Sequence, residues 1–277
     1  MVATSTLEEQ PLDETFDSLY QVLRRERTRT ETEREAFEAF ADRIIDLRPT
    51  GASPSTTPTG ETLRTTGTGE TLISRVSSTA ATTDHLAVIR DAYKKTVMSV
   101  PFYEAEYGDT YEESLREEFG SDIATALTQG SGFSPAAKRV LLAKVEKARA
   151  ERDALIETCD REHESIEEAA AVLTPIDEEL RSFESIPLNH QEFDALEVHR
   201  DRLLTLKDEC EQAATTRQAT IQDHRREYTL PLEAPDICAY LYKPLEPDYP
   251  VLSLCSELAH QIGTERRHVE HAISAHS

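Results

Sequence analysis

Two cysteines and one histidine are the residues of this sequence whose types best suit metal chemistry. Cys159 and His163 lie one helical turn apart, and Cys210 faces the same level if the chain reverses near position 187. Thiolate and imidazole groups on facing helices are zinc ligands, but a zinc site needs four of them in a tetrahedron. His199 and His224 fall more than a turn away, so no fourth ligand is evident. We predict no metal or cofactor, with Cys159, His163 and Cys210 as the candidates for a metal or redox site and core packing as their alternative.

Other patterns that could do chemistry are weak. Carboxylate pairs such as Glu117-Glu118 recur throughout the chain, so no pair stands out as an acid/base couple. The segment TTGTGET lacks the strand and helix context of a phosphate loop. Tyr103, Tyr107 and Tyr111 are spaced by four, which favours packing over a ligand pocket. We predict that the chain is not an enzyme, has no catalytic residues and binds no small-molecule ligand.

A long antiparallel helical hairpin over 134–228 is the element that would position these residues. Apolar residues alternate four and three apart from Leu141 to Phe183, which is the spacing of a coiled-coil seam. Ser134-Pro135 suits a helix start. Leu188, Asn189 and Phe193 predict a tight reversal, with a hydrophobic staple, at the start of the second arm.

Two charged residues interrupt the seam of the first arm. Arg152 and Glu162 occupy positions that a coiled coil normally fills with apolar side chains. A polar group there either pairs across the interface and fixes the register, or is reached by water because no helix covers it. The sequence leaves both alternatives open.

The rest of the chain divides into four further segments. We predict an N-terminal helix over 12–48, solvated between Arg24 and Arg34, and a flexible Thr/Ser/Gly/Pro linker over 49–84. A helical head segment covers 85–130, and a C-terminal head segment with a last helix covers 229–277. The two head segments are expected to meet at the open end of the hairpin. The expected fold is all-α, and the N-terminal helix either packs on the hairpin or swings out.

The composition is strongly acidic. The 277 residues include 53 Asp and Glu against 30 Lys and Arg, a formal net charge of −23. Such a surface is typical of a salt-accumulating cytoplasm, where a short Debye length removes self-repulsion. It argues against nucleic acid as a ligand. The sequence contains no run of about 20 apolar residues and no signal peptide, so we expect a cytoplasmic protein without membrane contact.

Four blocks of sequence carry a resemblance to a known family. They are EREAFEAFADRI (33–44), IRDAYKKTVMSVPFYEAEYGDTYEESL (89–115), FSPAAKRVLL (133–142) and YLYKPLEPDYPVL (240–252). In order and spacing they resemble an uncharacterised haloarchaeal helical protein family of unknown function. The resemblance implies salt adaptation but brings no ligand or catalytic residue.

These observations favour a non-enzymatic helical scaffold or protein-interaction module, with a protein partner or self-association. Helices in a two-stranded hairpin keep a partly exposed flank that a further helix can cover. The alternative is a metal- or redox-sensing regulator that uses Cys159, His163 and Cys210.

Overall fold

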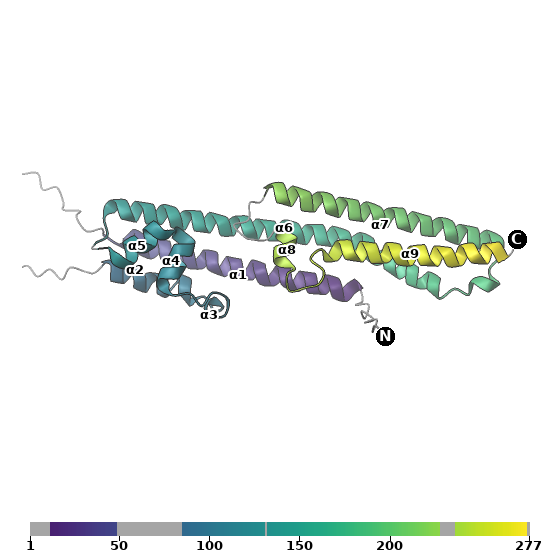
Figure 1. Ribbon diagram of the computed structural model, residues 1–277, viewed down its shortest axis with the longest axis horizontal. Helices are drawn as coiled ribbons and strands as arrows, with labels where there is room; N and C mark the ends of the chain where they lie inside the picture. The colour runs from purple at the N-terminus through teal and green to yellow at the C-terminus, as the bar shows by residue number, and fades with distance from the viewer. Residues whose placement is uncertain (1–11, 49–84, 131, 228–235, 276–277) are drawn as a thin grey trace, which may run out of the picture. The chain divides into compact units, whose positions relative to one another are not determined.

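The computed structural model describes residues 12–48, 85–130, 132–227 and 236–275, and within them all regular structure is helical (Figure 1). The predicted all-α class is therefore confirmed, whereas the predicted linker over 49–84 lies outside the described residues. None of the described helices is long and apolar enough to cross a membrane. The α-helices are α1 (Leu12–Asp46), α2 (His85–Lys94), α3 (Tyr103–Glu106), α4 (Tyr111–Phe119), α5 (Ser121–Gln129), α6 (Pro135–Glu184), α7 (Phe193–Glu227), α8 (Ile237–Leu241) and α9 (Pro250–Ala275). The short 3-10 helices are η1 (Val97–Ser99) and η2 (Leu188–His190).

The chain forms two compact units, and the long helices α1 and α6 each contribute to both. The terminal unit contains residues 1–30 and 154–277, and the central unit contains residues 31–153. Each unit has an apolar core of its own. The two units are therefore described separately.

The core of the terminal unit is built from apolar stripes on α1, α6, α7 and α9. Leu19, Leu173, Leu203 and Ile262, one from each helix, have no exposed surface. Each stripe repeats at helical spacing, so each helix can bury only one face and needs neighbours to cover it. The sequence of the last helix has one apolar stripe at helical spacing, and all of it is buried: Val251, Cys255, Leu258, Ile262 and Val269.

Aromatic rings fill the core of the central unit. The ring of Phe40 on α1 meets Tyr93 on α2 edge-on at 5.2 Å, and Tyr93 meets Phe119 on α4 at 5.9 Å. The Tyr93 hydroxyl lies 2.8 Å from the Ser114 hydroxyl, so the buried polar end of the ring is satisfied. Thr110 and Glu113 have the sequence spacing of a capping box, and they form one at the start of α4.

The two segments predicted to form a head fall in different compact units, and their meeting stays a prediction. Helices α2 to α5 belong to the central unit, whereas α8 and α9 belong to the terminal unit, where α9 packs along α7. The arms of the hairpin are unequal, because α6 has 50 residues and α7 only 35.

The tip of the hairpin also differs from the prediction. Residues Leu188–His190 form a 3-10 turn, and α7 begins at Phe193 rather than at Asn189. The Phe193 side chain, expected to form the staple with Leu188, is 43% exposed. The longer reversal changes the register: facing residues have numbers that sum to about 380, as in the ion pairs Glu162–Arg217 and Glu179–Arg202.

The middle of α1 is not the solvated stretch that the sequence predicts. In the terminal unit, Glu26 accepts a hydrogen bond from the Tyr240 hydroxyl at 2.6 Å, and Thr30 is buried. In the central unit, Glu33 accepts one from Arg152 at 3.2 Å. Polar side chains on α1 therefore pack through hydrogen bonds where apolar residues are missing from the stripe.

Candidate functional site

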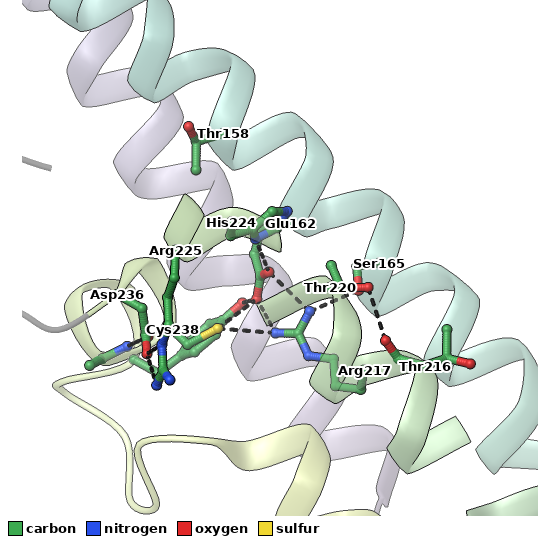
Figure 2. A network of polar contacts seen from close by, with 12 residues as sticks. Thr158, Glu162, Ser165, Thr216, Arg217, Thr220, His224, Arg225, Asp236 and Cys238 are labelled. Atoms are coloured by element: carbon green, nitrogen blue, oxygen red, sulfur yellow. Dashed lines mark hydrogen bonds and ion pairs between the residues drawn. The ribbon is translucent and has the colours of Figure 1, made fainter. Parts of the chain in front are cut away.

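A buried ion pair joins α6 to α7 in the terminal unit. Glu162 on α6 has no exposed surface, Arg217 on α7 is 3% exposed, and the two side chains form a bidentate pair. Arg217 Nη1 also donates to the Ser165 hydroxyl at 2.8 Å. Figure 2 shows Glu162 and Arg217 pointing at each other from facing helices. The Glu162 break in the seam therefore pairs across the interface, as one of the two sequence alternatives requires.

Three more side chains complete the shell of Glu162. The Tyr242 hydroxyl donates to Glu162 Oε1 at 2.8 Å, Cys238 Sγ lies 3.7 Å from the same oxygen, and His224 Nδ1 lies 3.6 Å from Oε2. Burial and the Glu162 charge raise the pKa of both Tyr242 and Cys238. Burial alone lowers the pKa of Arg217, but the Glu162 carboxylate outweighs it and the net shift is upward. At neutral pH the phenol and the thiol of the cluster are therefore protonated.

A second ion pair orders the segment that delivers Cys238 and Tyr242. Asp236 caps α8 by accepting from the Ala239 backbone N–H at 3.0 Å. Its carboxylate also accepts from Arg225 Nε and from the Tyr249 hydroxyl, each at 2.8 Å. Burial raises the pKa of Asp236, but these hydrogen bonds lower it by more. The pair therefore fixes α8 against the end of α7 (Figure 2).

A groove of about 580 Å³ lies between α6 and α7 beside this cluster; we name it the α6–α7 groove. On α6 it is lined by Ser165, Glu168, Ala169 and Val172, and on α7 by residues between Asp208 and Arg217. The lining positions recur three and four apart, so they form one face of each helix. Ala169 and Ala213 leave room between the helices because their side chains end at Cβ.

The rim of the groove is acidic and its floor is apolar. Glu168, Asp208 and Glu209 are exposed, whereas Ala169 is 7% exposed and Val172 is 39% exposed. The cation that lines the groove, Arg217, is buried and paired with Glu162. The groove can therefore accept an apolar group, and its rim favours positive charge around that group.

The other interruption of the seam, Arg152, forms a comparable cluster in the central unit. Its guanidinium donates to Glu118 through two nitrogens at 2.6 and 2.9 Å and lies 4.9 Å from the centre of the Phe37 ring. Burial raises the pKa of Glu118, and Arg152 opposes that rise. The adjacent cavity of about 250 Å³ is lined by Tyr103 and Tyr107. Tyr103 and Tyr111 are buried, as the packing interpretation of the tyrosine spacing expects, whereas Tyr107 is 41% exposed.

The structure places the three candidate metal ligands in different surroundings. Burial, with the charges of Glu26 and Asp160, raises the pKa of Cys159 to about 12. The ring of His163 meets that of Tyr20 edge-on at 5.1 Å, and the Cys210 thiol donates to the Cys255 carbonyl at 3.2 Å.

In the new register, Cys210 faces about residue 170 rather than 164. Among the described residues no three His, Cys, Asp or Glu side chains are grouped to hold a metal ion. The metal- or redox-sensing hypothesis stays a prediction, and a stoichiometric zinc signal in the purified protein would support it.

Sequence reasoning missed Arg217, Cys238 and Tyr242, although Arg217 carried a usable signal. It lies four residues after Ala213 and four before Ile221, two apolar residues on the seam of the second arm. An arginine on the seam of one arm and a glutamate on that of the other predict a buried pair. Cys238 and Tyr242 had no such signal, because they follow the hairpin and precede the last helix.

Comparison with known proteins supplies a family. Residues 14–266 match the family described as Domain of unknown function (DUF7260). The chain belongs to the DUF7260 family. No curated protein and no solved structure matches the chain.

The DUF7260 match extends over both units. It includes the Arg152 cluster, the Glu162–Arg217 pair and the whole α6–α7 groove, and it ends within α9. These features therefore lie inside the DUF7260 domain rather than in an appended segment.

Proposed function

We propose that this DUF7260 protein is a non-enzymatic helical scaffold that binds a protein partner through the terminal unit. The α6–α7 groove is the observation that carries the proposal. It presents Val172 to solvent between two long helices whose relative position is held by the buried Glu162–Arg217 pair. A preorganised apolar groove loses little conformational entropy when a partner binds, so less of the binding free energy is offset.

The contacts of the two charged clusters favour a structural role for these residues over a catalytic one. Glu162 and Arg217 are buried and bonded to each other, and Arg152 is bonded to Glu118 and Glu33. Each of these groups forms its hydrogen bonds with other groups of the protein, so none is presented to a substrate. The clusters set the register of the helices, and the groove is what they position.

The proposed setting is a salt-rich cytoplasm. It is supported by the net charge of −23, by the predominance of arginine over lysine, and by the resemblance of four sequence blocks to haloarchaeal proteins. In molar salt a charged interface contributes little, whereas burial of apolar surface still contributes. An apolar groove suits such a solvent.

Site-specific photo-crosslinking in the host cell tests the proposal. A benzophenone amino acid at Val172 lies in the groove, whereas the same group at Leu204 lies outside it with an equal exposure of 39%. The expected result is an adduct of defined mass from position 172 that is absent from position 204. Equal adducts from both positions, or none from either, would contradict a binding role for the groove.

A further inference from the structure

The rim charges of the α6–α7 groove indicate what kind of partner it accepts. Glu168, Asp208 and Glu209 surround an opening whose floor includes Ala169 and Val172. Among the described residues, Glu168 and Asp208 take part in no ion pair. Glu209 forms one ion pair through a single carboxylate oxygen, Oε1, which lies 3.3 Å from Arg202 Nη1. The groove thus pairs a narrow apolar floor with unneutralised negative charge on both sides.

The dimensions of the groove match the ridge of an α-helix. On α6 the lining runs from Ser165 to Val172, two turns or about 10 Å at 1.5 Å per residue. Two antiparallel helices that stand apart offer a groove along their axes, into which a row of side chains three and four apart can insert. Helices bound in this manner contact their groove through apolar anchors on one face.

We infer that the α6–α7 groove binds an amphipathic helix that has an apolar ridge and basic flanks. The inference rests on the proposed scaffold function and names the chemistry of its partner. Leucine-like side chains would lie over Ala169 and Ala213, beside Val172. Lysine or arginine on either flank would lie against Glu168 and Asp208. A second copy of this chain fits less well, because its net charge of −23 would face an acidic rim.

A designed helical peptide of leucine and lysine tests the inference in the full-length protein. Its leucines lie on one face, and binding is followed by fluorescence anisotropy at low salt and in molar KCl. One control peptide has the same composition with the leucines spread around the helix, and another replaces lysine by glutamate. We expect the amphipathic Leu/Lys peptide to bind at both salt concentrations. The scrambled peptide should bind at least about tenfold more weakly in molar KCl, where long-range attraction is screened, and the glutamate peptide at least about tenfold more weakly at low salt, where the rim charges act.

Paired variants locate the binding. Val172→Gln removes an apolar contact from the groove and should weaken the peptide about fivefold, whereas Leu204→Gln, at a position of equal exposure outside the groove, should change affinity less than about twofold. Glu168→Lys with Asp208→Lys should weaken binding about tenfold or more. Glu164→Lys with Glu178→Lys makes the same charge change at exposed positions outside the groove and should have a smaller effect.

The outcomes separate this inference from the proposed function. Equal binding of the scrambled peptide, or equal effects of the groove and control variants, would overturn the basic-helix inference. If Val172 cross-links to a host protein while the Leu/Lys peptide does not bind, the scaffold function stands and the inference fails. If sedimentation shows a dimer that Val172→Gln dissociates, the occupant is a second copy, and the inference is also wrong.

Discussion

At the scale of residues, the molecule depends on charged side chains that are buried in complementary pairs. Glu162 is surrounded by Arg217, Tyr242 and Cys238, and every one of these groups is nearly or completely inaccessible to solvent. Removing water from two charges is costly, and the cost is offset only while both partners are present. The pair is therefore more informative about register than about net stability.

This reasoning predicts a large coupling between Glu162 and Arg217. Either Glu162→Gln or Arg217→Met should lower the free energy of unfolding by about 3–5 kcal/mol, since each leaves its partner buried and incompletely bonded. The double variant should lose clearly less than the sum of the two. Urea unfolding in high salt measures all three. Glu157→Gln, which breaks the exposed ion pair with Arg161, is the control and should cost less than about 1 kcal/mol. Additive losses would show that the pair does not act as a unit.

A second residue-scale prediction concerns His199. Burial lowers the pKa of its imidazole below the ordinary 6.5, an effect that Glu265 only partly opposes, and the ring packs on Phe183 at 4.1 Å. The unfolded chain therefore binds this proton at a higher pH than the folded protein does. Stability should fall as the pH drops through about 6.5 and level off below the folded-state pKa. Urea titrations at several pH values should show this slope in the wild type and a smaller one in His199→Gln, and equal slopes in the two proteins would contradict the prediction.

At the scale of elements, the sequence predicts where helices form better than it predicts which helices pack against one another. The Ser134 cap, the Thr110 capping box and the apolar stripe from Val251 to Val269 all appear in the structure, because caps and periodicity are local properties. A stripe shows that a helix must be covered but does not name the helix that covers it. The packing of α9 on α7 could not be predicted for this reason.

The register of the hairpin was equally hard to predict. The 3-10 turn at Leu188–His190 delays the start of α7 and moves Cys210 away from the level of Cys159. A few residues at the tip thus decide which side chains meet far along the arms. The candidate metal site depended on that register, whereas the groove depends on Ala169 and Ala213, whose small side chains give no distinctive signal in a sequence.

Two glycines that lie at or within helices predict changes of opposite sign in the stability of the protein when each is replaced by alanine. Gly120 joins α4 to α5 at φ +89°, a conformation that side chains disfavour, although nothing would touch an added Cβ. Gly120→Ala should therefore destabilise the protein by about 1–3 kcal/mol through the backbone alone.

Gly263 is the matched comparison. It lies inside α9, and an added Cβ also meets nothing within 4 Å. Gly263→Ala should stabilise the protein by up to about 1 kcal/mol, because alanine loses less conformational freedom in a helix. Thermal unfolding of both variants checks the prediction, and a shift in the same direction for both would contradict it.

At the scale of the whole molecule, the excess of carboxylates dominates. The chain has 53 acidic and 30 basic residues, and many of the ion pairs lie on exposed helix faces within single helices, such as Glu112–Arg116 and Lys207–Glu211. Exposed pairs of this kind contribute little each. The remaining negative charges repel one another and oppose the compact state unless salt screens them.

The last prediction follows from that repulsion. Unfolding in urea should require more denaturant in about 3 M KCl than in about 0.1 M KCl, because the Debye length falls from about 10 Å to 3 Å or less. Salt also strengthens the burial of apolar surface, so a rise alone does not isolate the charge effect. A variant with Glu164→Gln, Glu178→Gln and Glu257→Gln removes three exposed carboxylates that form no ion pair among the described residues, and it leaves the core unchanged. It should be more stable than the wild type at low salt by a few tenths of a kcal/mol per site, about the value of an exposed charge interaction, and nearly equal to it at high salt.

The difference in the free energy of unfolding between the variant and the wild type isolates the charge effect, because the apolar contribution is the same in both proteins. If that difference is unaffected by KCl, or if the variant is less stable at low salt, charge repulsion is not what salt relieves in this molecule.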